Sequence, residues 1–199
     1  MTFLLRQFAY TILDMANELG KVKVTIVLLC TLQLTGTAEN WLIGTPAPEW
    51  SNDQWINSPS LKLVELKRKV VLIRFFMESD CPFCRASAPH LNRFYDAYAS
   101  RGLVVIGMYT PKPAPVSTPM ETVRRYVTEY GFRFPVALDN DWTTLNKYWL
   151  HRVADADFTS VTFLIDKKGI VRYIHPGGAY SPDDAAQIQK KIEELLLES

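Results

Sequence analysis

The sequence has little of what defines several large classes of protein. Only 3 cysteines occur in 199 residues, too few for a small scaffold held together by disulfides. The 22 lysines and arginines are balanced by 21 aspartates and glutamates, so there is no basic footprint for nucleic acid and we expect no such partner. An internal repeat, a P-loop and a dinucleotide-binding fingerprint are also missing. With 48% hydrophobic and 22% charged residues, the composition is that of one ordinary globular domain.

The N-terminal region lacks an apolar run long enough to cross a bilayer. Residues 24–34 (VTIVLLCTLQL) form a shorter apolar segment that contains Cys30, follows Lys21 and Lys23, and precedes small residues at 35–38. A spanning helix needs about 20 apolar residues, so this pattern favours a signal peptide. We predict a leader over residues 1–38, an exported domain over 39–199, and a periplasmic or other extracytoplasmic location. An uncleaved membrane anchor, or an amphipathic helix packed on the domain, is the alternative for this segment.

The rest of the chain alternates between strand and helix patterns. Residues 70–76 and 103–108 are nearly continuous apolar runs, typical of strands covered on both faces, and a helical period between them ends at Gly102. Similar patterns predict further strands at 134–138, 161–165 and 170–175, and helices at 120–130, after Asp141 and after Ser181. This order predicts a single α/β domain whose mixed central sheet carries helices on both faces, with parallel strands first and an antiparallel hairpin last. The tryptophan-rich segment at 39–60 is predicted to be an irregular lead-in that packs on the domain.

Cys81 and Cys84 stand directly after the first apolar strand, at the start of its helix. Free N–H groups and the positive end of the helix dipole stabilise a thiolate there, so we expect Cys81 to be the exposed nucleophile. Cys84, one turn on, can then attack the mixed disulfide that Cys81 forms. A structural disulfide explains the pair poorly, because so short a loop removes little chain entropy. Half a zinc site is the other alternative, but there is no second cysteine pair and the histidines are scattered, so we expect no metal.

These residues resemble the thioredoxin fold. The resemblance rests on residues 69–76 (KVVLIRFF), 81–84 (CPFC), Pro89 and 161–166 (VTFLID). Together with residues 43–48 (IGTPAP), the chain is similar to the exported TlpA-like thiol-disulfide oxidoreductases of the AhpC/TSA-redoxin group, from about residue 43 to 197. The resemblance implies Cys81 as the attacking thiol, Cys84 as the resolving thiol and Pro89 as a kink in the active-site helix. It also implies a redox-active Cys81–Cys84 disulfide in place of any cofactor.

The chain departs from the family pattern beside the cysteines. Asp80 replaces the tryptophan that commonly precedes the first cysteine, and Pro82 and Phe83 lie between the two thiols. Negative charge from Asp80 and Glu78 should oppose the helix dipole and favour a reducing pair. We hypothesise that one of these carboxylates also shuttles the proton of the second thiol. The alternative is a helix-capping aspartate and a solvated glutamate.

A second departure concerns the segment Thr159-Ser160-Val161, where the family usually has a cis-proline facing the cysteines. Without proline a cis peptide bond costs about 2.5–4 kcal/mol, so we expect a trans bond. The substrate-facing edge should therefore be altered. Thr159, Ser160 and Val161, with the loop at 151–158, are our candidates for contact with a substrate.

The sequence thus predicts a thiol-disulfide oxidoreductase that reduces protein disulfides. Its partners would be a protein disulfide substrate and a membrane-embedded thiol reductant, because exposed dithiols do not stay reduced in an oxidising compartment. A thiol peroxidase, a peroxiredoxin-like antioxidant, is an alternative on the same scaffold. Its usual Pro-x-x-x-Thr/Ser-x-x-Cys motif is not matched, since the chain has Arg74 and Glu78 at the motif positions. A metal chaperone is a further alternative, which would need a third ligand near the sulfurs.

Overall fold

The computed structural model describes residues 40–199 except 79, 113–115, 155 and 157–158. The predicted leader over residues 1–38 lies outside these residues. Within the described part of the chain, none of the helices combines the length and the apolar character that crossing a membrane requires.

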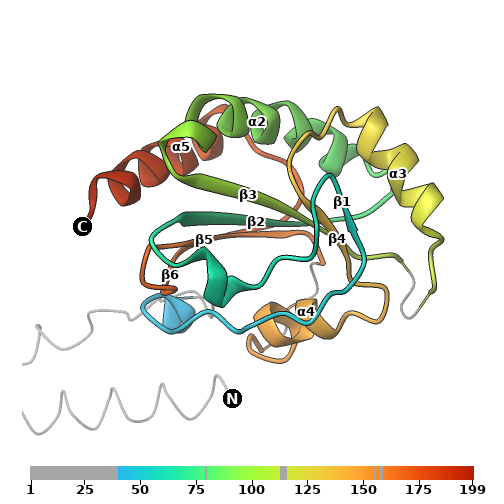
Figure 1. Cartoon of the computed structure of the whole chain (residues 1–199), viewed down its shortest axis with the longest axis horizontal. Helices are drawn as coiled ribbons and strands as arrows, with labels where there is room; N and C mark the ends of the chain where they lie inside the picture. The colour runs from blue at the N-terminus through green and yellow to red at the C-terminus, as the bar shows by residue number, and fades with distance from the viewer. Residues whose placement is uncertain (1–39, 79, 113–115, 155, 157–158) are drawn as a thin grey trace, which may run out of the picture. The chain divides into compact units, whose positions relative to one another are not determined.

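A mixed sheet of six strands in the order β1-β4-β3-β2-β5-β6 forms the centre of the fold (Figure 1). The strands are β1 (Trp55–Ile56), β2 (Val70–Phe76), β3 (Leu103–Tyr109), β4 (Val136–Leu138), β5 (Val161–Ile165) and β6 (Val171–Pro176). β2, β3 and β4 are parallel, whereas β5 runs antiparallel to β2 and to β6. The predicted parallel first part and antiparallel hairpin are both confirmed. β1, which pairs antiparallel with β4, was not predicted, because two residues carry no readable period.

Helices cover both faces of the sheet, as predicted. They are α2 (Pro82–Tyr98), α3 (Met120–Glu129), α4 (Thr143–Leu145) and α5 (Pro182–Leu197), with short turns η2 (Asn40–Leu42), η3 (Leu63–Leu66), η4 (Ala99–Arg101) and the π-helical η5 (Asn146–Leu150). Figure 1 shows α2, α3 and α5 on one face and α4 on the other. The predicted stop after the first helix is confirmed, since Gly102 takes the left-handed conformation with a φ of 106°. The strand predicted at 134–138 begins at Val136 instead.

Side chains of β2 alternate between two cores. Leu72 and Phe76 belong to the core that includes α2 and α5, whereas Ile73 and Phe75 belong to the core on the opposite face. This alternation is the two-residue period of a strand, and burial on both faces explains the continuous apolar run in the sequence. Arg74 shares the side of Leu72 and Phe76 and is fully buried. A cation therefore lies inside the layer between the sheet and the helix that begins at the cysteines.

The lead-in segment packs on the domain, as expected, and its tryptophans Trp50 and Trp55 lie on the face opposite α2. Trp50 and Trp55 are buried, with ring centroids 6.4 Å apart. They share a core with Leu42, Tyr148 and Trp149. The segment thus completes the hydrophobic cover of the sheet on this face.

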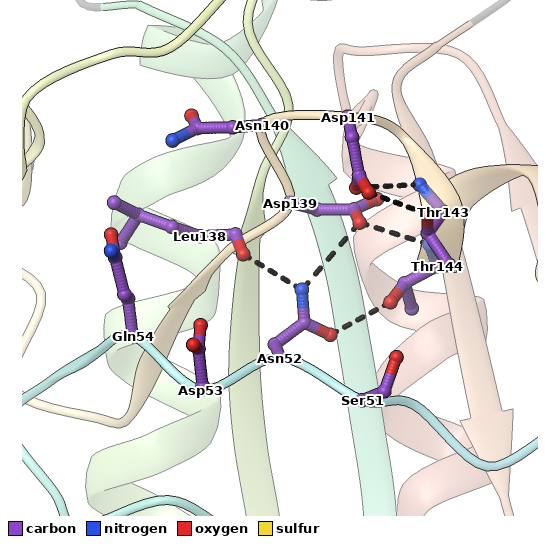
Figure 2. Close-up of a pocket in the computed structure, with 10 residues that line it drawn as sticks. All are labelled: Ser51, Asn52, Asp53, Gln54, Leu138, Asp139, Asn140, Asp141, Thr143 and Thr144. Atoms are coloured by element: carbon purple, nitrogen blue, oxygen red, sulfur yellow. Dashed lines mark hydrogen bonds between the residues drawn. The ribbon is translucent and has the colours of Figure 1, made fainter.

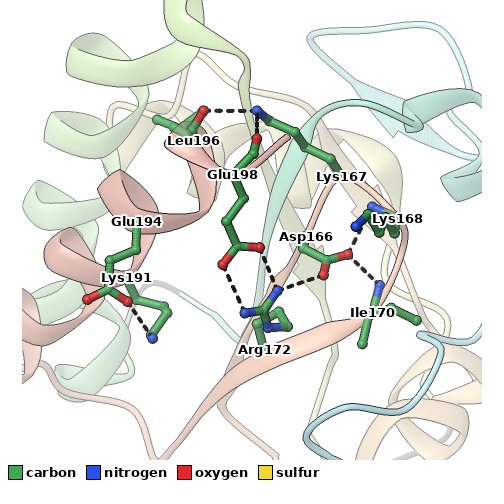
Figure 3. Close-up of polar contacts among 9 residues, drawn as sticks. All are labelled: Asp166, Lys167, Lys168, Ile170, Arg172, Lys191, Glu194, Leu196 and Glu198. Atoms are coloured by element: carbon green, nitrogen blue, oxygen red, sulfur yellow. Dashed lines mark hydrogen bonds and ion pairs between the residues drawn. The ribbon is translucent and has the colours of Figure 1, made fainter.

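Charged contacts tie the C-terminal end of α5 to the turn between β5 and β6 (Figure 3). Arg172 donates to Asp166 at 2.9 Å and pairs with both carboxylate oxygens of Glu198 at 2.7 and 2.9 Å. Lys167 Nζ donates to the carbonyl of Leu196 at 2.9 Å and to that of Glu198. Burial acts to raise the pKa of Asp166, but two amides of the turn and Arg172 outweigh it and lower the pKa overall.

Candidate active site

Cys81 is the N-cap residue of α2, and Pro82 occupies the start of the helix. The Sγ atom of Cys81 accepts a hydrogen bond from the amide of Cys84 at 3.3 Å, the contact that a serine or aspartate usually provides at this position. Both cysteines are free thiols. The predicted placement of the pair at the helix start is confirmed. Pro89 lies inside α2, and its role as a kink stays a prediction.

The two cysteines are less exposed than we expected. Cys81 is 7% exposed and Cys84 is 1% exposed. The expectation of an exposed Cys81 is therefore wrong for this conformation, because its sulfur turns back to cap the helix and joins the core of that face. Phe83, between the two thiols, is 60% exposed instead.

Cys84 is more deeply buried than Cys81, and this burial affects its pKa. The pKa of Cys84 is raised to about 11, chiefly by burial and next by a hydrogen bond with Cys81. A backbone hydrogen bond from Met77 and the positive charge of Arg74 act in the opposite direction. Cys84 is thus a protonated thiol at neutral pH and must lose its proton before it can act as a nucleophile.

The segment before β5 lies beside this thiol. Ser160 Oγ is 3.8 Å from Cys84 Sγ, and the Ser160 carbonyl accepts a hydrogen bond from the Gly177 amide at 2.9 Å. Thr159 Oγ1 donates to Met77 Sδ at 3.5 Å, and Val161 begins β5 and is fully buried. The predicted substrate edge is therefore next to the cysteines. Contact with a substrate, and the trans peptide bond, stay predictions.

Glu78 and Asp80 precede Cys81, and the structure shows a backbone role for the first. The Glu78 carbonyl accepts hydrogen bonds from the Cys81 amide at 3.1 Å and from the Tyr130 hydroxyl at 2.8 Å. Burial, with the charges of Cys84 and Cys81, raises the pKa of Tyr130 well above its usual value. Asp80 is exposed. The proton-shuttle hypothesis for the two carboxylates stays a prediction.

Arg74 and Tyr130 are site residues that the sequence reasoning missed. Arg74 is surrounded by neutral acceptors: Nη1 donates to Thr162 Oγ1 (3.1 Å) and the Gly177 carbonyl (2.9 Å), and Nη2 to Ser87 Oγ (3.4 Å) and the Gly178 carbonyl. Its Nε has no hydrogen-bond partner in the described part of the chain. A single charge inside an apolar strand was the available signal for Arg74. Tyr130 falls in the helix predicted at 120–130, and that pattern carries no signal for its hydroxyl.

The histidines do not join the site. His175 Nε2 lies 3.0 Å from the Ala179 carbonyl, and His90 Nδ1 lies 2.8 Å from Arg93. Within the residues that the structure describes, no cluster of three His, Cys, Asp or Glu side chains could hold a metal ion.

A separate polar pocket of about 260 Å³ lies where β4 ends (Figure 2). Asn52 reaches into it from the segment before β1 and donates to the Leu138 carbonyl at 2.7 Å. At its base, the buried Asp139 carboxylate accepts from the amides of Thr144 at 2.9 Å and Leu145 at 2.8 Å. Burial raises the pKa of Asp139, although these amides oppose the shift.

Two aspartates that accept hydrogen bonds from amides of α4 line this same pocket. The helix predicted after Asp141 is confirmed, and Asp141 accepts from the Thr143 amide at 3.1 Å, but the N-cap residue of α4 is Trp142. Asp139 accepts from the next two amides, a contact that was not predicted.

The parallel βαβ unit, the antiparallel hairpin and the Cys-x-x-Cys at the start of α2 define a protein of the thioredoxin fold. The model of the AhpC/TSA family matches residues 43–174, and the chain belongs to this family. The family and the thioredoxin-like α/β fold predicted from the sequence are both confirmed.

Several known proteins are similar to the chain. Protein DipZ of Mycobacterium tuberculosis is 37% identical over 130 residues, which cover 62% of this chain and 17% of DipZ. The thiol-disulfide oxidoreductase ResA of Halalkalibacterium halodurans is 28% identical over 123 residues, covering 62% of each chain. The crystal structure of a thioredoxin-like superfamily protein matches with a TM-score of 0.64 and 28% identity, over 77% of this chain and 97% of that one. The chain spans less than two thirds of the length of these two curated relatives.

Proposed function

We propose that the chain is a thiol-disulfide oxidoreductase that exchanges a Cys81–Cys84 dithiol with disulfides in other proteins. The observation that carries this proposal is the cap at the start of α2, where the Cys81 sulfur accepts a hydrogen bond from the amide of Cys84. A negative charge on that sulfur is favoured by the same amide and by the positive end of the helix. The names of the relatives, thiol-disulfide oxidoreductase among them, support the same class.

In the first step, the Cys81 thiolate attacks one sulfur of the substrate disulfide. A bond forms between Cys81 and that sulfur, the substrate S–S bond breaks, and the other substrate sulfur leaves and takes up a proton. In the second step, the Cys84 thiolate attacks Cys81 Sγ and releases the remaining substrate sulfur. The substrate disulfide gains two electrons and two protons, and the chain is left with a Cys81–Cys84 disulfide.

The exposed surface around the pair indicates where a substrate would bind. Phe83 is 60% exposed and lies against Gly178, where any side chain would overlap the Phe83 side chain. The base of the Phe83 side chain therefore packs against the backbone of Gly178, and most of the side chain stays exposed. We infer that Phe83 contacts the polypeptide that flanks a substrate disulfide.

We also propose that the protein works outside the cytoplasm and is recharged by a membrane-embedded thiol reductant. The apolar segment at 24–34, with its flanking lysines and small residues, supports export. In an oxidising compartment a dithiol needs a continuous source of electrons. Fractionation of cells, with the mass of the mature chain, tests the location and separates a cleaved leader from an anchor.

The exchange reaction is tested with the full chain, an oxidised protein substrate such as insulin, and dithiothreitol as the recycling thiol. Cys81→Ser should abolish turnover. When dithiothreitol is left out, Cys84→Ser should accumulate a mixed disulfide with the substrate, because no second thiol is present to resolve it. Cys30→Ser is the matched control and should keep full activity. Consumption of peroxide through Cys81, without reduction of any disulfide, would instead support the peroxidase alternative.

A further inference from the structure

We propose that Arg74 is a positioning residue for the second half of the exchange, in which its buried guanidinium stabilises the thiolate that Cys84 forms to resolve the mixed disulfide. The inference rests on the proposed dithiol exchange, and it gives a functional role to the one charged side chain of β2.

The positive charge of Arg74 is buried and incompletely compensated. Arg74 is fully buried, and a buried cation is costly unless an anion or a full set of acceptors balances it. Its hydrogen-bond acceptors are all neutral oxygens, Nε remains without a partner, and no carboxylate of the described residues forms an ion pair with it. The positive charge is therefore available to an anion that forms nearby.

Hydrogen bonds connect Arg74 to the surroundings of Cys84 on two sides. On one side, Arg74 Nη2 donates to Ser87 Oγ at 3.4 Å, and Ser87 Oγ donates to the Cys84 carbonyl at 3.0 Å. On the other side, Arg74 Nη1 donates to the Gly177 carbonyl, and the Gly177 amide donates to the carbonyl of Ser160. The guanidinium is thus linked both to the backbone of Cys84 and to the segment whose hydroxyl lies 3.8 Å from the Cys84 sulfur.

The titratable and charged groups of this region differ in their effect on the Cys84 sulfur. Cys81 on α2 disfavours a second negative charge, and Arg74 on β2 favours it. Tyr130 follows α3, is influenced by both cysteines, Glu78 and Arg85, and stays protonated. Tyr180, whose ring centroid lies 5.1 Å from the Arg74 guanidinium, is also held in its neutral form by burial. Arg74 is thus a cation that favours a negative charge on the Cys84 sulfur.

The step that Arg74 assists involves no added reactant. Cys84 gives its proton to solvent, its thiolate forms a bond with Cys81 Sγ, and the bond between Cys81 and the substrate sulfur breaks. The substrate sulfur departs with the electron pair and takes up a proton. A cation near Cys84 lowers the free energy of the attacking thiolate and so raises the fraction of molecules able to react.

The test uses the reduced full chain and the disulfide 5,5′-dithiobis(2-nitrobenzoate), which releases one coloured thiol when Cys81 attacks and a second when Cys84 resolves. Arg74→Met, which has no charge, should slow the second phase at about pH 8 by at least about threefold. A fraction of Cys84 thiolate that is about tenfold smaller would by itself slow the attack about tenfold. The more basic sulfur is a better nucleophile by about threefold, so the net slowing is about threefold. The midpoint of the second phase should also move to higher pH. The first phase should change less.

Two matched variants separate charge from structure. Arg74→Lys keeps the charge and should restore most of the second phase and its pH midpoint. Arg133→Met removes the charge of an exposed arginine that pairs with Asp96 outside this cluster, and should leave the second phase and its midpoint unchanged. Arg74→Gln, which retains donors for the glycine carbonyls, replaces Arg74→Met if the latter does not fold.

The outcomes for the two proposals differ. A wild-type chain without a second phase would overturn the dithiol exchange itself. A wild-type chain with both phases, beside a neutral variant at Arg74 with the same ratio of phases and the same pH midpoint, would overturn the role of Arg74 and leave the exchange reaction standing.

Discussion

Arg74 and Asp139 are both buried charged residues, but the groups around them differ. Both oxygens of Asp139 accept hydrogen bonds from backbone amides at the start of α4, and Asn52 lies 3.5 Å from one of them. Arg74 has neutral acceptors for its Nη atoms and no partner for Nε in the described residues. A buried charge whose hydrogen bonds are complete fixes a loop, whereas one that is incompletely compensated can act on a neighbouring reaction.

The first way to test this comparison is to remove the satisfied charge. Asp139→Ala leaves the buried amides of Thr144 and Leu145 without acceptors, so the free energy of unfolding should fall by about 2–3 kcal/mol. The exchange rate per folded molecule should not change, because the pocket of Figure 2 is separate from the cysteines. Denaturant unfolding and the two-phase thiol assay measure these quantities. A large loss of exchange activity with unchanged stability would reverse the roles assigned to the two charges.

A second test uses pH and compares Asp139 with Asp166, whose pKa values are shifted in opposite directions. The pKa of Asp139 is raised in the folded chain, so its carboxyl favours folding below the ordinary pKa of about 3.9, and this contribution is lost as pH rises through the raised value. The pKa of Asp166 is lowered, so its contribution is present above about 3.9 and is lost as pH falls through the lowered value.

Asp139→Asn and Asp166→Asn separate these contributions. The stability of wild type relative to Asp139→Asn should decrease as pH rises above about 4. Its stability relative to Asp166→Asn should increase as pH rises toward about 4. Denaturant unfolding across this range measures both differences, and slopes of the same sign would contradict the assignment.

How much of this could be predicted from the sequence depends on the range of the interactions. The β2–α2 unit follows from local signals: a continuous apolar run, then two cysteines at a helix start and the stop at Gly102. The role of Asn52 depends on a partner, Leu138, that is 86 residues away in the chain, and no local pattern carries such a contact. The burial of Cys81 was missed for another reason, because the cap geometry turns its sulfur inward.

A third prediction concerns Tyr130, for which we expect an effect on both stability and exchange. Tyr130→Phe removes the hydrogen bond to the Glu78 carbonyl and should lower the free energy of unfolding by about 1 kcal/mol. Because that carbonyl also holds the Cys81 amide, the first phase of the thiol assay should slow slightly more than the second. Arg74→Met should show the opposite order. If both variants slowed the same phase, the two residues would not act on different cysteines.

The smallest expected effect is at Ser160, whose hydroxyl is 3.8 Å from the Cys84 sulfur. At this distance a contact between a hydroxyl and a thiol is weak, and the Ser160 carbonyl keeps its hydrogen bond from Gly177 whatever the side chain is. Ser160→Ala should therefore slow the second phase by less than about twofold, a free-energy change below about 0.5 kcal/mol. Measured beside Arg74→Met, this variant compares the neutral hydroxyl of Ser160 with the positive charge of Arg74 as stabilisers of the resolving thiolate. A larger effect for Ser160→Ala than for Arg74→Met would mean that the Ser160 hydroxyl, and not the guanidinium, is the main group that stabilises the Cys84 thiolate. A neutral hydroxyl can have so large an effect only through a direct hydrogen bond to the thiolate.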